Sequence, residues 1–112
     1  MTEAIPAAAD PRWYPDLGEP YAVPRLLWTP PVMPWDKEPF PPRPGVDFLI
    51  DTAPWWRDRR QALEAHRTQR VTIDKLYLTQ PNCEEMLSFD VLRQGFGPPL
   101  LHQPEADVFT GL

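Results

Sequence analysis

The apolar positions in the first half of the chain are set among closely spaced prolines. Proline recurs at positions 11, 15, 20, 24, 30, 31, 34, 39, 41, 42 and 44, and the largest gap is six positions. Because proline fixes φ and lacks the backbone donor, this spacing excludes a long helix and a central strand. Between and after the prolines lie the large aromatic side chains Trp13, Tyr14, Tyr21, Trp28, Trp35, Phe40 and Phe48.

Turn residues and short apolar runs predict a few local elements in this extended half. Asp16-Leu17-Gly18 and Pro44-Gly45 carry residue types that favour tight turns. The runs at residues 21–23 and 25–29 are long enough for edge-strand pieces, and residues 46–50 predict a short strand. The small and polar residues 1–10 are expected to form a flexible or loosely docked lead.

A helix is predicted from residue 52 or 53 to about residue 68. Thr52 is a residue type that caps helices, and Pro54 suits a first turn because its missing N–H has no helical partner there. The opposite side of this helix is mostly charged. At helical spacing, the side expected to face the core carries Trp55, Arg59, Ala62, Leu63 and His66.

Two further elements are expected in the second half. The run VTIDKLYL at residues 71–78 predicts a strand, because its apolar and polar positions partly alternate. A second helix is predicted to begin at Asn82, with Glu85 three positions later as in a capping box, and to end at Gly95. Its inner face is expected to carry Cys83, Met86, Leu87, Asp90 and Val91.

These patterns divide the chain into three segments. Residues 1–50 are an extended arm rich in proline and aromatic residues, residues 51–96 are a small α+β module of helix, strand and helix, and residues 97–112 are an extended, docked tail. The predicted fold class is therefore a mostly irregular, extended proline-rich chain with few regular elements. Because the core is small and no disulfide supports it, we expect the isolated chain to be poorly folded.

Composition and charge exclude several classes of protein. The chain has 112 residues, a net charge of −5, and 12% aromatic residues. The aromatic content is too high for an acidic disordered tail, and the negative charge argues against a specific or general nucleic-acid partner. A single cysteine cannot form an internal disulfide, which favours a reducing compartment.

Few residues are suited to catalysis or metal binding, and they lie far apart. Cys83, His66 and His102 are the only soft or borderline metal ligands, and none of the paired spacings of zinc sites occurs. The five glycines are scattered, so there is no phosphate-binding loop. We therefore expect no catalytic residue, metal, cofactor or small-molecule substrate.

The segment Trp55-Trp56-Arg57-Asp58-Arg59-Arg60 is the most distinctive local pattern. Two main interpretations stay open: the tryptophans pack in the core beneath the arginine stems, or they contact a partner surface. The prolines at 39–42 and 41–44 have the spacing of ligands for SH3-type grooves. That short pattern is common in proline-rich chains, so docking as part of a longer arm is favoured.

A segment that cannot fold on itself, yet carries many large aromatics, is typical of a chain that lies on another protein. We therefore expect a non-catalytic structural subunit that wraps or cements larger subunits of an assembly, most specifically a minor virion protein in the tail or capsid of a bacterial virus. The alternatives are a small accessory subunit of a multi-subunit bacterial enzyme and a soluble adaptor that presents proline motifs. The residues expected to bind the partner are Trp13, Tyr14, Tyr21, Trp28, Trp35, Phe40, Trp55 and Trp56.

The location follows from two sequence features. No apolar run approaches the roughly 20 residues needed to cross a bilayer. Residues 1–10 lack the basic and apolar regions of a signal peptide. We expect a protein with no membrane partner, located in the cytoplasm or assembled into a virion and not secreted by a signal peptide.

Overall fold

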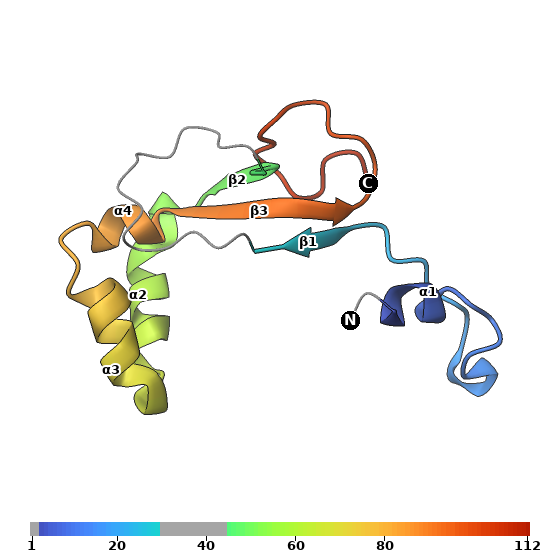
Figure 1. The fold of residues 1–112 in the computed structure, drawn as a ribbon, viewed down its shortest axis with the longest axis horizontal. Helices are drawn as coiled ribbons and strands as arrows, with labels where there is room; N and C mark the ends of the chain where they lie inside the picture. Colours follow the sequence, from blue (N-terminus) through green and yellow to red (C-terminus); the bar gives the residue numbers. More distant parts are fainter. Residues whose placement is uncertain (1–2, 30–44) are drawn as a thin grey trace.

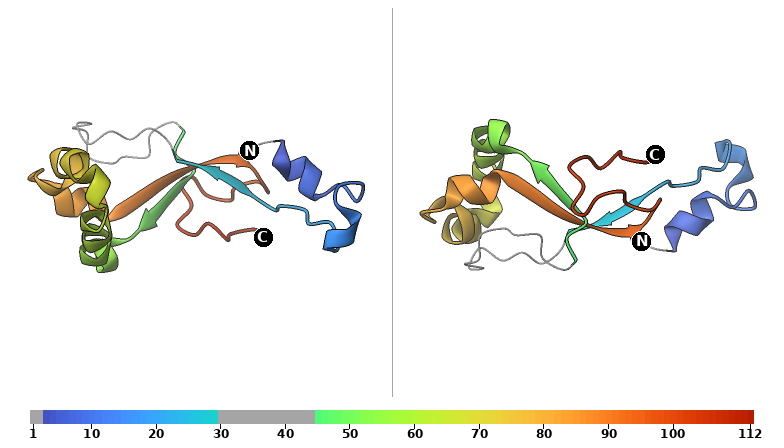
Figure 2. Two further views of the ribbon diagram at one scale, coloured as in Figure 1. Left: turned by 90° about the horizontal axis from the view of Figure 1, so that it is seen from below. Right: turned by 90° about the horizontal axis from the view of Figure 1, so that it is seen from above.

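The helices of the chain gather near the two ends of one long strand. The computed structural model describes residues 3–29 and 45–112 (Figure 1). Its helical elements are α1 (Ala4–Ala8), η1 (Pro15–Leu17), η2 (Ala53–Trp55), α2 (Trp56–Glu64), η3 (Arg67–Gln69), α3 (Arg70–Ile73), the π-helical η4 (Asp74–Leu78) and α4 (Cys83–Leu87). Its strands are β1 (Leu26–Trp28), β2 (Phe48–Asp51) and β3 (Phe89–Phe96). Figures 1 and 2 show α2, α3 and α4 at one end of β3 and α1 beyond the other. The prediction of a small α+β module is confirmed.

The strands form one antiparallel sheet in the order β1-β3-β2. β2 pairs with the first half of β3, where Ile50 lies opposite Asp90. β1 pairs with the second half on the other edge, where Leu27 lies opposite Gln94. Residues 26–28 belong to the predicted arm, so part of the arm is bound to its own chain. The expectation that the arm cannot fold on its own protein is wrong for these residues.

The close approach of β1 to β3 depends on a glycine. A Cβ atom at Gly95 would overlap the indole of Trp28, whose Cδ1 atom lies 2.8 Å from that position, and would crowd Leu26 at 3.1 Å. Only glycine leaves this space for the indole. The sequence pattern predicts Gly95 as a helix end, but in the structure it is a strand residue on which Trp28 packs.

Phe48 is the one described side chain with no exposed surface. The Arg25 guanidinium lies over its ring, with the Cζ atom 5.1 Å from the ring centroid. The same guanidinium donates hydrogen bonds to the carbonyl oxygens of Val108 and Thr110, the second at 2.6 Å. Arg25 therefore joins the N-terminal half, β2 and the tail around one buried ring.

Glu105 docks the tail on the sheet, as the sequence predicted for this segment. Its N–H donates to the Asp47 carbonyl at 2.8 Å, and its own carbonyl accepts from the N–H of Leu49 at 2.9 Å. The buried carboxylate accepts the N–H groups of Leu101 and His102. These bonds offset the cost of burying the charge, and the tail covers the outer edge of β2.

A second small core lies among the helices. Trp56 and Leu63 of α2 pack against buried residues from α3, η4 and α4. We call these buried residues the helical cluster, and they are Ile73, Leu78, Cys83 and Leu87.

Arg59 fixes the helical cluster to the sheet. Its Nη1 atom donates to the Leu87 carbonyl at 2.9 Å and to the Thr52 hydroxyl, and its Nη2 atom pairs with Asp90 at 2.7 Å. Thr52 makes no helix-capping hydrogen bond, contrary to the prediction, because its hydroxyl donates to the Leu87 carbonyl at 3.1 Å.

The predicted inner face of the first helix is shifted along the chain. Trp55 is 58% exposed, whereas Trp56 packs against the helical cluster. Leu63 faces inward as expected, but Ala62 and His66 are exposed. The tight turn of η2 before α2 changes the angular phase from that of one continuous α-helix, which explains the shift.

The strand predicted at residues 71–78 is wrong, because this segment forms α3 and η4. Ile73 and Leu78 are both buried in the helical cluster although they are five residues apart. The wider π-helical turn, in which the Thr79 N–H donates to the Asp74 carbonyl, brings residues at this spacing to one face. Shared burial therefore overrides the β-branched residues at the start of the segment.

The second predicted helix is mostly wrong as well. α4 covers only Cys83–Leu87, and Asn82 makes no capping hydrogen bond. Cys83 and Leu87 do share a buried face, as predicted, but Met86 is only half-buried. The prediction is wrong for Asp90 and Val91, which lie on β3. Residues 89–96 instead form β3, because strands from distant parts of the sequence pair with both of its edges.

The smaller predictions for the arm have mixed outcomes. The expected strand pieces at residues 25–29 and 46–50 correspond to β1 and β2, but residues 21–23 form no strand. Gly45 has the positive φ of 93° that favours a turn. Its predicted turn partner, Pro44, lies outside the described residues.

Gly95→Ala should lower the free energy of unfolding by about 1–3 kcal/mol, because the added methyl group would push the Trp28 indole off β3. Urea unfolding measures this change. In a Trp28→Ala background the same substitution should cost much less, since the space is then open. Equal costs in both backgrounds would contradict the contact.

Arg25→Lys should loosen the tail, because lysine lacks the planar fork that reaches two carbonyl oxygens. A charged hydrogen bond contributes about 1.5–3 kcal/mol, so amide hydrogen exchange at Glu105 should accelerate roughly tenfold or more. Arg93→Lys, at an exposed position on β3, is the matched control and should leave this exchange unchanged. If the Glu105 amide exchanges equally slowly in the two variants, the Arg25 hydrogen bonds do not hold the tail in place.

Candidate partner-docking surface

The N-terminal lobe, defined as residues 3–21, folds back on itself through local hydrogen bonds. The N–H of Tyr21 donates to the Ala8 carbonyl at 2.8 Å and closes the lobe. Pro15 opens η1 with the fixed φ that suits a first helical position. Gly18 follows η1 with a φ of 124°, so the turn predicted at residues 16–18 is confirmed.

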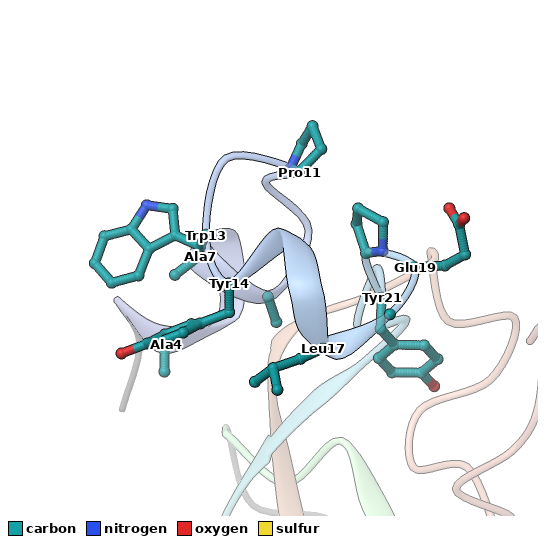
Figure 3. Close-up of a pocket in the computed structure, with 11 residues that line it drawn as sticks. Ala4, Ala7, Pro11, Trp13, Tyr14, Leu17, Glu19 and Tyr21 are labelled. Atoms are coloured by element: carbon teal, nitrogen blue, oxygen red, sulfur yellow. The ribbon is translucent and has the colours of Figure 1, made fainter.

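The surface of the lobe carries an open hollow of about 390 Å³ (Figure 3). Figure 3 shows Trp13 and Tyr14 on one side of η1 and Tyr21 on the other, with Leu17 between them. Small residues of α1 complete the wall, and Glu19 is its one acidic member. The hollow is therefore mainly apolar and aromatic.

The large side chains around the hollow are exposed. Trp13, Tyr14, Leu17 and Tyr21 are 59%, 69%, 82% and 65% exposed, and neither α1 nor η1 contains a buried residue. The rings of Trp13 and Tyr14 meet edge to face, with centroids 6.2 Å apart. Contiguous exposed apolar surface of this kind marks interaction sites.

Asp10 and Arg12 brace the turn that carries the aromatic pair. The Asp10 carboxylate accepts the Arg12 backbone N–H at 2.9 Å and pairs with the guanidinium at 2.7 Å. The guanidinium lowers the pKa of Asp10 below its ordinary value, and the carboxylate raises the pKa of Arg12. Because Arg12 is exposed, the pair orders the turn and adds little to the free energy of folding.

The structure brings three of the expected partner-binding residues together and separates others from them. Trp13, Tyr14 and Tyr21 line the hollow. Trp28 lies against β3 and is 42% exposed. Trp55 is exposed near the other end of the molecule, where α2 begins.

The remaining expected residues differ from this group. Trp56 packs against the helical cluster, and the Arg57 guanidinium lies over its ring at 5.3 Å. Trp56 therefore packs against the core, whereas Trp55 is exposed and available to a partner. Trp35, Phe40 and the two PxxP spacings lie outside the described residues.

Sequence reasoning did not select Leu17 and Glu19, which also line the hollow. Leu17 sits in a predicted turn, and an apolar side chain between two turn formers is a signal that it is presented outward. No comparable signal singles out Glu19, since acidic residues are common in loops.

The three candidate metal ligands do not meet in the structure. Cys83 is buried in the helical cluster, and His66 and His102 are exposed. Within residues 3–29 and 45–112, no three His, Cys, Asp or Glu side chains are arranged to hold a metal ion. None of the helices in these residues has the length and apolar character needed to cross a membrane.

No protein-family model matches this chain, and comparisons with curated proteins and with solved structures find no similar protein.

The pKa of the Asp10 carboxyl should lie below its ordinary value of about 3.8 and should rise toward it in Arg12→Gln. A lowered folded-state pKa means that the pair supports the turn above that ordinary value and loses its effect as pH falls through the folded pKa. A carbon-13 NMR titration of the carboxyl tests this. Arg93→Gln is the control, and an Asp10 titration that ignores Arg12→Gln would contradict the pairing.

Proposed function

We propose that this chain is a non-catalytic structural subunit that docks on neighbouring chains of a larger assembly through its N-terminal lobe. The observation that carries the proposal is the hollow of the lobe. Its large apolar walls are exposed, and neither α1 nor η1 buries a residue. A surface that contributes so little to its own fold gains most from burial against another chain.

The balance of buried and exposed side chains supports the same proposal. In the described residues five apolar side chains are buried, whereas eleven large apolar side chains are exposed. Each large side chain removed from water contributes about 1.5–3 kcal/mol. Burial on a partner therefore offers a larger stabilisation than the small internal core provides.

The position of the lobe suits docking. Figures 1 and 2 show it beyond the end of β3, away from the helices at the opposite end. The chain leading out of the lobe is held by β1 and by Arg25. The lobe is thus presented on a fixed base, which reduces the entropy lost on binding.

The most specific form of the proposal is a minor virion protein in the tail or capsid of a bacterial virus. An accessory subunit of a bacterial enzyme is the alternative with the same docking geometry. Purification from the native source separates them, because the co-purifying chains are structural and present in many copies in one case and include an active site in the other.

Replacing Trp13, Tyr14 or Tyr21 singly by Ala should reduce incorporation into the assembly. Anchors of this type often contribute above ~2 kcal/mol each, which corresponds to roughly a thirtyfold weaker affinity. Phe109→Ala is the matched control, because Phe109 is an equally exposed aromatic residue on the tail. Quantitative incorporation measured against wild type is the readout. If all three variants incorporate like Phe109→Ala, the lobe is not the docking surface.

A further inference from the structure

The N-terminal lobe is acidic as well as aromatic. It carries Glu3, Asp10, Asp16 and Glu19 against Arg12. Arg12 is already paired with Asp10, and the other three carboxylates have no ion-pair partner among the described residues. The apolar hollow is therefore set in a surface of uncompensated negative charge.

The opposite end of the molecule has the complementary character. We define the helical tip as residues 60–71, which connect α2 to α3 through η3. It carries Arg60, Arg67 and Arg70 against Glu64. Arg60 is paired with Glu64, and Arg70 is paired with Asp74 just beyond the tip. Arg67 is exposed and is the one arginine of the tip with no ion-pair partner in the described chain, and Val71, four positions later on α3, is 84% exposed. The helical tip thus presents one unpaired guanidinium and an exposed apolar side chain.

The lobe and the helical tip cannot meet within one chain. Figures 1 and 2 agree that α1 and the helices α2 and α3 lie at opposite ends of the long axis, which extends 52 Å. Between them runs β3, which is paired on both edges. Contact between them requires a second copy of the chain.

We propose that the helical tip of one copy docks on the aromatic hollow of the N-terminal lobe of the next copy. This inference rests on the proposed function, since it names the partner of the same lobe. Arginine suits the site because its planar cation stacks on aromatic faces and pairs with carboxylates such as Glu19. Val71 enters the apolar part of the contact. Opposite charge on the two surfaces favours this head-to-tail orientation over head-to-head or tail-to-tail pairing.

The geometry is heterologous, because the two surfaces that meet are different. Each copy keeps one unused lobe and one unused tip, so association continues into a ring or an open filament. Charge complementarity also makes the contact sensitive to salt, with a screening length of about 3 Å at 1 M.

Sedimentation equilibrium of the full-length chain tests the proposal. At low salt the average mass should rise with concentration above the 13.0 kDa of one chain, and 1 M salt should return it toward that value. A lobe variant, Trp13→Ala with Tyr14→Ala, and a tip variant, Arg67→Ala with Arg70→Ala, should each remain monomeric alone. Circular dichroism confirms that these exposed substitutions leave the fold intact.

Mixing the two variants gives the sharpest result. The tip of the lobe variant and the lobe of the tip variant are both intact, so an equimolar mixture should form 1:1 dimers and nothing larger. Arg93→Ala, which removes a cation from β3, should associate like wild type. Monomeric wild type at every concentration, or a mixture that stays monomeric while wild type associates, would overturn the proposal.

The two proposals fail in different ways. If wild type is monomeric but Trp13→Ala still loses incorporation into the assembly, the head-to-tail contact is wrong and the lobe docks on another protein. If Trp13→Ala and the other lobe variants also incorporate normally, both proposals are wrong.

Discussion

The fold depends on the burial of one ring, Phe48, beneath the guanidinium of Arg25. Three segments that are far apart in the sequence meet there. Arg25 comes from the N-terminal half, and Phe48 is the first residue of β2. The tail contacts Arg25 through its carbonyl groups and contacts Phe48 through Glu105. Apart from this crossing, β1 is held by its ladder to β3. Without the buried ring, Arg25 would lose the surface on which it packs, and the tail would be held to the sheet chiefly by the bonds of Glu105.

That arrangement explains why local sequence predicts some elements and misses others. Proline spacing limits the first half to short pieces, and β1 and the turn before Gly18 follow from it. The start of the first helix can also be predicted from local sequence, because Pro54 suits a first helical turn. β3 is not local. It is a strand because β1 and β2 pair with it from distant positions, and nothing between residues 89 and 96 announces those partners.

The candidate docking surface also combines features that local sequence predicts with features that it does not. The sequence marks Trp13, Tyr14 and Tyr21 as aromatics that proline keeps out of regular structure, so their exposure is predictable. Their gathering around one hollow is not, because it requires the bond from Tyr21 back to Ala8 and the local bracing by Asp10. Proline spacing shows that the segment is irregular, but it does not show where an irregular chain folds back.

The residues that stabilise the fold and the large exposed residues of the lobe lie in different parts of the molecule. The residues that hold the fold, Phe48 and the helical cluster, are buried and tolerate little change. α1 and η1 bury nothing, so the large side chains around them weaken solubility without supporting the fold. Exposed aromatics with that cost are explained when another surface covers them. Because β3 separates the lobe from the helical cluster, docking at the lobe as proposed would leave the small core undisturbed, so the chain would stay folded on binding.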